Sequence, residues 1–284
     1  MSLRIPTRRA MLYTPPVAAG GSYSGPGDVV SGAFAWYGLR AYNAAYATGS
    51  NPALDLLDQA GANAITINIL SDGRLDVASI SAWVTANSVT TIKITRIYDQ
   101  TGNTRHVDQA TLGNMPVLNL TGFGSLPSMD FTAASSHFLE SSATVTQAQP
   151  FSFATVQLRG SASGNIVINS TGVRMRTVSG GIEIHAGANA QALTAANGSW
   201  HAVQSVFNNT SSAICVDGTE TTGLTVGTAT PSSSTIAIGK TATVASFDGS
   251  MAEVGLWPSG FTTGGGGQVA SMNTNQHGTD GYNF

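Results

Sequence analysis

The chain has 284 residues, of which 42% are hydrophobic and only 10% are charged, and its formal net charge is -3. Since a usual charged fraction is about 25%, Ser, Thr, Asn, Gln and Gly must cover much of the surface. The small negative charge provides no basic stripe and argues against nucleic acid as the main partner. Cys215 is the single cysteine, which excludes an intrachain disulfide and a thiolate metal cluster.

The first 31 residues predict an extended N-terminal arm. They contain Arg4, Arg8 and Arg9, a Pro15-Pro16 pair and the glycine-rich run GGSYSGPG, a composition that cannot bury itself. The arm is either a leader without fixed structure or an anchor that docks onto a larger assembly. No apolar run of signal-peptide length follows the cations and no stretch is long enough to span a bilayer. We therefore expect a protein made in the cytoplasm, with no membrane insertion.

Short β-type runs begin after the arm. Ile65, Ile67 and Ile69 alternate with polar residues, which is the period of a half-buried strand. Residues 91–98 predict another strand, and its alternation slips at Ile97, which suggests a β-bulge.

One short helix is predicted between these strands. Val77, Ile80 and Val84 fall at helical spacing, Asp76 is placed as the N-cap, and Asn87 is a plausible stop.

From Met115 onward the sequence predicts strands and turns at short, even spacing, which is typical of a β-sandwich. Asp217-Gly218 and Asp248-Gly249 are dipeptides that accept positive φ in hairpins and turns. We predict an all-β chain with a sandwich over residues 32–260. The glycine-rich residues 261–284, with Gly264 to Gly267 in a row, are expected to form a loose C-terminal strap.

The segment IYDQTGNTRHVDQ, residues 97–109, concentrates polar side chains around one glycine. Asp and Asn side chains bond to nearby backbone groups, and glycine adopts conformations closed to other residues, so the segment is suited to a self-satisfied loop. Its motif residues are Tyr98, Asp99, Gln100, Gly102, Asn103, His106 and Gln109. A ligand role for Asp99, Gln100, Asn103 and His106 stays open. A calcium site at Asp99 and Asp108 also stays open, although two carboxylates fall short of the six or more oxygens that Ca²⁺ takes; otherwise we expect no metal and no cofactor.

A second polar site is predicted in a hairpin. A two-residue turn at Ser179-Gly180 would place Arg176 opposite Glu183 and Arg174 opposite His185 on one face. The cluster is either a solvated ion-pair face or a platform for a sugar. In the second case Trp36, Tyr37 or Trp257 would stack on the sugar, unless these aromatics belong to the core.

Two sets of segments carry a family resemblance. Residues 200–207 (WHAVQSVF), 214–219 (ICVDGT), 235–239 (TIAIG) and 247–257 (FDGSMAEVGLW) resemble, in order and spacing, a laminin-G or concanavalin A-like jelly roll. Residues 33–40 (AFAWYGLR), 72–76 (DGRLD), 97–109, 115–118 (MPVL) and 128–131 (SMDF) are similar to the α-L-arabinofuranosidase B catalytic-like domain. That concanavalin A-like module is also found in phage tail and virion proteins.

The resemblance implies one jelly-roll sandwich and two alternative functions. The first is a non-catalytic structural protein of a phage virion, in its tail, fibre or capsid decoration, which binds a cell-surface glycan. Its expected partners are other virion proteins, reached through the arm, and further copies of itself, with a trimer as one option. The second is an α-L-arabinofuranosidase-like glycoside hydrolase. Hydrolysis needs two carboxylates flanking the bond, and Glu140, Glu220 and Glu253 have no obvious acidic partner in the sequence; no serine triad, P-loop or dinucleotide motif is present either.

Overall fold

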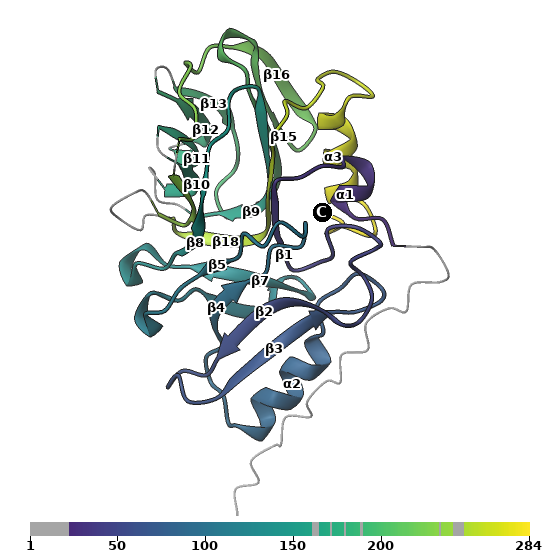
Figure 1. Ribbon diagram of the computed structural model, residues 1–284, viewed down its shortest axis with the longest axis vertical. Coiled ribbons are helices and arrows are strands. Elements are labelled where there is room, and N and C mark those ends of the chain that lie inside the picture. The colour runs from purple at the N-terminus through teal and green to yellow at the C-terminus, as the bar shows by residue number, and fades with distance from the viewer. Residues whose placement is uncertain are drawn as a thin grey trace, which may run out of the picture.

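The computed structural model describes residues 23–160, 165–170, 172–178, 180–187, 190–232, 234–240 and 247–284, and only the backbone of residues 165–170 and 190–192. Two antiparallel β-layers face each other across an apolar interior, and a smaller lobe of strands with one helix extends below them (Figure 1). The all-β sandwich expected from the sequence is confirmed.

The first sheet contains strands from both ends of the chain. Its order is β1 (Ala35–Gly38), β18 (Gly249–Trp257), β9 (Phe151–Arg159), β14 (Trp200–Phe207), β15 (Ser212–Val216) and β16 (Thr219–Leu224). β18 lies between β1 and β9, so the closing strand of the sequence is internal to this sheet.

The second sheet runs from the hairpin region into the lower lobe. Its order is β13 (Ala190–Thr194), β12 (Gly181–Ala186), β11 (Val173–Val178), β10 (Asn165–Ser170), β17 (Ser234–Ile238), β8 (Leu139–Val145), β5 (Val107–Asp108), β4 (Lys93–Ile97), β2 (Asn51–Leu57) and β3 (Ala64–Ile69). The hairpin of β6 (Val117–Phe123) and β7 (Leu126–Phe131) joins the sheets, because β6 pairs with β4 and β7 pairs with β18.

The local predictions in the lower lobe are confirmed. In β3, Ile67 and Ile69 are fully buried while Thr66 is exposed. β4 carries the expected bulge, because Arg96 and Ile94 face consecutive residues of β2 and Thr95 is skipped. Helix α2 (Val77–Ala86) begins at the N-cap Asp76, whose carboxylate accepts from the Ser79 backbone N–H at 3.0 Å.

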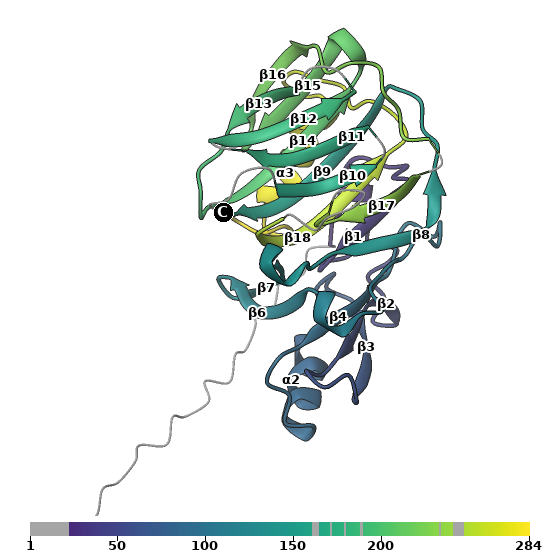
Figure 2. The same ribbon diagram turned by 90° about the vertical axis from the view of Figure 1, so that its left-hand side faces the viewer.

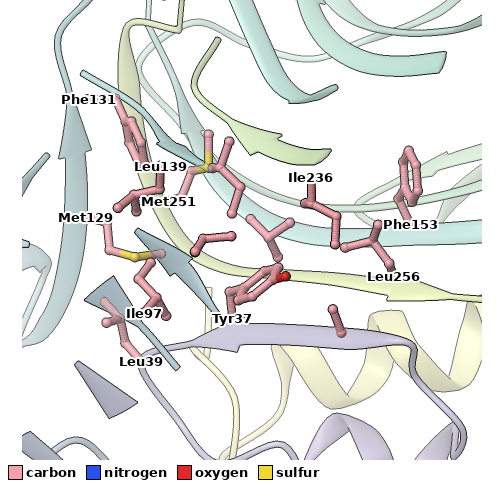
Figure 3. Packing of buried hydrophobic residues seen from close by; sticks show 14 of the residues in the cluster. Tyr37, Leu39, Ile97, Met129, Phe131, Leu139, Phe153, Ile236, Met251 and Leu256 are labelled. Carbon is pink, nitrogen blue, oxygen red and sulfur yellow. The ribbon is translucent and has the colours of Figure 1, made fainter. Parts of the chain in front are cut away.

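The interior is one contiguous apolar cluster that reaches from the lower lobe into the sandwich. Where the sheets and the β6–β7 hairpin meet, side chains of both halves of the sequence pack together: Tyr37, Leu39, Ile97, Met129, Phe131, Leu139 and Met251 (Figure 3). Further up, Phe151 and Phe207 stack with ring centroids 4.8 Å apart. Neither half encloses this core alone.

The C-terminal segment differs from the loose strap that was predicted. It forms helix α3 (Gln268–His277), which lies against β14 and covers the outer face of the first sheet. Phe261, Val269 and Met272 pack there onto Trp257 and Cys215. Packing of these apolar residues on the sheet stabilises a helix that has no side-chain N-cap and few strong helix formers.

The predicted extended arm of residues 1–31 is wrong for residues 23–31. Residues 1–22 lie outside the described residues, but residues 23–31 are packed against the sandwich. They include helix α1 (Pro26–Val29) and Tyr23, which is 9% exposed and donates to the Ala41 carbonyl oxygen at 2.5 Å. α1 contacts α3, so the two helices that the sequence did not predict cover the same face.

The remaining helical turns are short 3₁₀ segments, η1 (Leu112–Asn114), η2 (Ala133–Ser135) and η3 (Asn209–Ser211). The predicted Asp217-Gly218 turn joins β15 to β16, with φ of 50° and 80° at the two residues. Positive φ at both positions is the signature of a type I′ hairpin turn.

Candidate functional site

The outer face of β11 and β12 carries the four residues predicted from the hairpin. Val173, Met175, Ile182 and Ile184 point into the core, and alternation along a strand places the residues between them on the opposite face. In Figure 2 these strands lie toward the viewer, with α3 behind them. The outward residues are Arg174, Arg176, Glu183 and His185.

The register of this hairpin is the one predicted. Arg176 pairs with Glu183 and Arg174 pairs with His185, across a two-residue connection that includes Gly180 at φ 84°. The Arg176 Nε lies 2.5 Å from the Glu183 Oε1, and the two side chains are 27% and 11% exposed. This ion pair is therefore largely withdrawn from water, unlike a solvated surface pair. Whether the four residues bind a ligand stays a prediction.

Arg174 and His185 are held in a less favourable electrostatic setting. The Arg174 Nε and the His185 Nδ1 are buried without a hydrogen-bond partner. Burial lowers the pKa of the Arg174 guanidinium, and the neighbouring charge of Arg176 lowers it further. Burial and the charge of Arg174 likewise lower the pKa of His185 below its usual value, so the imidazole is neutral at neutral pH.

The hairpin is one end of a polar row that crosses the second sheet. From Arg174 the register continues through Asn169 of β10 and Ala237 of β17 to Glu140 of β8. From Glu140 it continues through Asp108 of β5 and Arg96 of β4 to Asp55 of β2. The sequence did not predict this row, because its members come from segments far apart in the chain.

At the far end of the row, each cation is paired with a carboxylate. Arg96 Nε lies 2.5 Å from Asp108 Oδ1, and Arg96 Nη1 lies 3.9 Å from Asp55 Oδ2. Lys240 Nζ lies 2.5 Å from Glu140 Oε2 and 4.0 Å from the Phe138 ring centroid. Burial would raise the pKa of Glu140, but hydrogen bonds from Lys240 and Thr235 outweigh it and hold that pKa below the usual value.

The segment 97–109 forms a hydrogen-bonded loop around Asp99, which is 4% exposed. The Asp99 carboxylate accepts from the backbone N–H groups of Trp36, Thr101 and Arg105, each at 3.1 Å. The Asp99 backbone N–H donates to His106 Nδ1 at 3.0 Å. Thus Asp99 connects strand β1 to the loop.

Gln100, Asn103 and Gln109 also bond to the protein itself. Gln100 accepts from the Tyr42 N–H at 2.8 Å and donates to the Gly38 carbonyl oxygen at 2.9 Å. Asn103 Nδ2 donates to the Phe34 carbonyl oxygen at 3.0 Å, and Gln109 accepts from the Thr111 N–H at 2.9 Å.

The backbone and ring geometry of the loop fits the same role. Gly102 has φ 85°, and the rings of Tyr98 and His106 meet edge to face with centroids 4.9 Å apart. Tyr98 donates to Asp55 Oδ2 at 3.0 Å. These contacts connect the loop to the far end of the polar row.

No group of three or more metal-ligating side chains occurs within the described residues. The two carboxylates considered for calcium have other partners, because Asp99 accepts backbone N–H groups and Asp108 pairs with Arg96. This chemistry fits hydrogen-bonded anchoring of a loop better than coordination of a hard cation.

The aromatic residues considered for sugar stacking are core residues. Trp36 and Tyr37 are fully buried and Trp257 is 1% exposed. Trp36 and Trp257 pack edge to face with centroids 6.0 Å apart on the face covered by α3. The stacking role suggested for these three side chains is therefore wrong. Two partly exposed aromatics contact the row or its neighbours: Tyr98 beside Asp55 and Arg96, and Phe138 beside Lys240.

A family model for the concanavalin A-like lectin/glucanases superfamily matches residues 146–263, the part of the chain that holds β9 to β18. The sandwich is a concanavalin A-like jelly roll. The predicted jelly-roll resemblance is confirmed. The apolar cluster of the sandwich continues through β1 into the lower lobe, beyond the matched range.

Solved structures of arabinofuranosidases share the concanavalin A-like fold of this chain. An arabinofuranosidase complexed with arabinofuranosyl-α-1,2-xylobiose has a TM-score of 0.66 and 17% identity, over 89% of this chain and 64% of the arabinofuranosidase. A GH54 α-L-arabinofuranosidase soaked with a cyclic sulfate inhibitor gives 0.64 and 16%, with the same coverage. This chain thus spans less than two thirds of those proteins, and identity this low establishes the fold alone.

A search of curated protein sequences found no match. Among the described residues, no helix has the length and apolar character needed to cross a membrane.

Proposed function

We propose that this chain is a non-catalytic structural and adhesion protein of a phage virion, and that its concanavalin A-like sandwich binds a glycan on the outer face of the second sheet. The observation that carries the glycan part is the polar row, which begins at Arg174 and His185 and reaches Asp55. A row of guanidinium, carboxylate and imidazole groups on a rigid sheet can bond several sugar hydroxyls at once. The fold is one shared with lectins and glucanases.

The carboxylates of the polar row are either far apart or paired with cations of the same sheet. All fifteen Asp and Glu residues belong to the described part of the chain. In the polar row, Glu183 on β12 and Glu140 on β8 are separated by four strand spacings, or roughly 19 Å. Glycosidases place their two carboxylates about 5 to 9.5 Å apart. This pair is too widely separated to flank one glycosidic bond. Asp108 lies opposite Glu140 on the adjacent strand, but Asp108 is paired with Arg96 and Glu140 with Lys240.

The other two glutamates are occupied elsewhere. Glu253 is fully buried and paired with Arg40. Glu220 accepts from the Gly264 backbone N–H at 3.0 Å. Neither lies free on the outer face of the second sheet.

The virion part of the proposal rests on the sequence. The charge-poor composition suits proteins that pack side by side, and residues 1–22 carry a quarter of the chain's Lys and Arg residues, at Arg4, Arg8 and Arg9. We propose that these residues dock onto other virion proteins and that the chain self-associates. A monomer by light scattering, with residues 1–22 intact, would count against self-association, and imaging of the native particle would locate the protein or fail to find it.

A glycan array tests the binding part directly. We expect the full chain to bind at least one class of glycan, and Arg176→Gln to reduce the signal because it breaks the ion pair that orients Glu183. Asp72→Asn is the matched control, since it removes an exposed carboxylate outside the row. An array on which nothing rises above background removes glycan binding from the proposal.

The alternative function is an α-L-arabinofuranosidase-like glycoside hydrolase, which the shared fold favours. Incubation with a chromogenic arabinofuranoside separates the two functions. We expect no turnover above the rate without protein. Turnover that disappears in Glu183→Gln, with the folded state unchanged by circular dichroism, would overturn the non-catalytic proposal.

A further inference from the structure

The hairpin end of the polar row has one more cation than anion. Arg176 pairs with Glu183, whereas Arg174 lies within 4.0 Å of no carboxylate in the described part of the chain. Every Asp and Glu of the sequence lies in that part. The counter-charge for Arg174 is therefore not available from any other segment of this chain.

The opposite end of the row provides the comparison. There Arg96 has Asp108 and Asp55, and Lys240 has Glu140. In a protein with so few charges, each of these cations has a carboxylate partner, and Arg174 does not. Among the cations of the row and its Lys240 neighbour, Arg174 at the hairpin is thus the one without a carboxylate partner in the described part of the chain.

Two polar atoms at this position also lack hydrogen bonds. Arg174 Nε and His185 Nδ1 are buried without a partner, and the two residues pair directly across β11 and β12. A buried donor without an acceptor is costly, so this position lacks compensation from the described chain at the buried edge of the guanidinium. An anionic oxygen placed against the exposed part of Arg174 would offset its charge.

We propose that Arg174 and His185 bind the anionic group of an acidic glycan, a sugar carboxylate or a sugar sulfate, which rests on the proposed glycan-binding function. The planar guanidinium of Arg174 matches the paired oxygens of a carboxylate or sulfate. His185 Nδ1 is buried, so the imidazole can bond an adjoining sugar hydroxyl through its other ring nitrogen. Arg176, fixed by Glu183, adds a second positive charge beside the anion.

The site should prefer an acidic glycan because an uncharged sugar has no negative charge to pair with Arg174. A hydroxyl would leave the Arg174 charge uncompensated, so an uncharged glycan of the same length gains less on binding. The long Arg side chain is partly exposed, so the attraction also weakens as salt is raised.

Isothermal titration of the full chain with four probes tests this site. The probes are a trigalacturonate, a sulfated galactotriose, an uncharged galactotriose and sodium sulfate alone. We expect one or both acidic trisaccharides to bind at least about tenfold more tightly than the uncharged one. The two acidic probes distinguish a carboxylate ligand from a sulfate ligand.

The variants Arg174→Gln and Arg174→Lys identify the residue responsible. We expect Arg174→Gln to remove most of the preference for the acidic probe. Arg174→Lys keeps the charge but loses the forked geometry, so it should retain part of the preference. Arg74→Gln is the control, because it removes a partly exposed cation outside the row and should leave the preference unchanged. Melting temperatures establish that each variant is folded.

The outcomes separate this inference from the proposed function. Equal binding of acidic and uncharged trisaccharides would overturn the anion site and leave glycan binding in place. An acidic preference that survives Arg174→Gln would also overturn it. Binding of none of the trisaccharides would overturn the acidic-glycan ligand, and sulfate bound alone would then indicate an anion site unrelated to sugars.

Discussion

Arg40, which follows β1, and Glu253 of β18 form a buried bidentate ion pair, with Arg40 Nε donating to Glu253 Oε2 at 2.7 Å and Nη2 donating to Oε1 at 3.2 Å. Arg40 is 3% exposed and Glu253 is fully buried. Both also bond to the C-terminal segment, since Arg40 donates to Asn275 Oδ1 at 2.8 Å and Gln276 donates to Glu253 Oε1 at 2.7 Å. The pair thus joins the first sheet to α3.

Glu253→Gln should destabilise the protein by about 3 to 5 kcal/mol, because it leaves the Arg40 charge buried without its carboxylate. Urea unfolding followed by circular dichroism measures the loss. Asp108→Asn breaks the more exposed pair with Arg96, in which both side chains are about 40% exposed, and should cost under about 1 kcal/mol. Equal losses in the two variants would contradict a structural role for the buried pair.

Asp99→Ala should destabilise the loop of residues 97–109 by at least about 2 kcal/mol, because it leaves the buried N–H groups of Trp36 and Arg105 without an acceptor. Asp72→Ala removes a similar Asx contact to the Arg74 N–H at an exposed turn and should change stability by less than about 0.5 kcal/mol. Urea midpoints of the two variants give the comparison. A ligand role without a structural one would appear as unchanged stability in Asp99→Ala.

His201 predicts a pH dependence of stability. Burial would lower the pKa of this imidazole, but its hydrogen bonds to Asp217, at 2.6 Å, and to the Ala196 carbonyl oxygen outweigh burial and raise that pKa above 6.5. A raised pKa in the folded state adds stability below the unfolded pKa, and that stability is lost as pH rises through the folded pKa.

The difference in unfolding free energy between the native chain and His201→Gln isolates this contribution from those of His137 and His185, whose pKa values are lowered. We expect the difference to be largest below pH 6 and to shrink toward pH 8 and above. Asp217→Asn provides a second variant that should remove the same dependence, because Asp217 is the carboxylate that bonds His201. Asp217 also lies 3.5 Å from Nε2 of His277, at the end of α3. A difference that is constant from pH 5 to pH 9 would rule the coupling out.

Asp76→Ala should cost about 1 kcal/mol, the usual effect of removing an N-cap. Asp76 accepts from both the backbone N–H and the hydroxyl of Ser79. Ser81→Ala, in the exposed interior of α2, removes a hydroxyl that bonds only to the Val77 carbonyl oxygen and serves as the control. Fluorescence of Trp83 during urea unfolding reports on this helix.

Features that depend on neighbouring residues were predictable from the sequence. The caps of α2 follow from Asp76 and Asn87, and the pairing of Arg176 with Glu183 follows from strand alternation and a two-residue turn. The bulge in β4 was visible as a slip in the alternation before Tyr98.

Features that depend on distant segments were not predictable. Helix α3 lacks a side-chain cap and is stabilised by Val269 and Met272 packing on a sheet built elsewhere in the chain. Arg40 and Glu253 are 213 residues apart, and the polar row needs the register of strands from both halves. The hairpin cluster was found because its residues are neighbours, whereas Asp55, Arg96 and Glu140 gave no local signal.

The position of β18 between β1 and β9 has a consequence for folding during synthesis. A ribosome releases residues 35–38 and 151–159 long before residues 249–257. The edges of β1 and β9 that pair with β18 therefore stay unpaired until β18 has been synthesised. Pairing over such sequence distances is slow, and unpaired edges in the waiting chain favour aggregation. Assembly of this sheet therefore begins only after β18 has been synthesised, and chaperone supply or lowered expression temperature should raise the soluble yield more than slower elongation does.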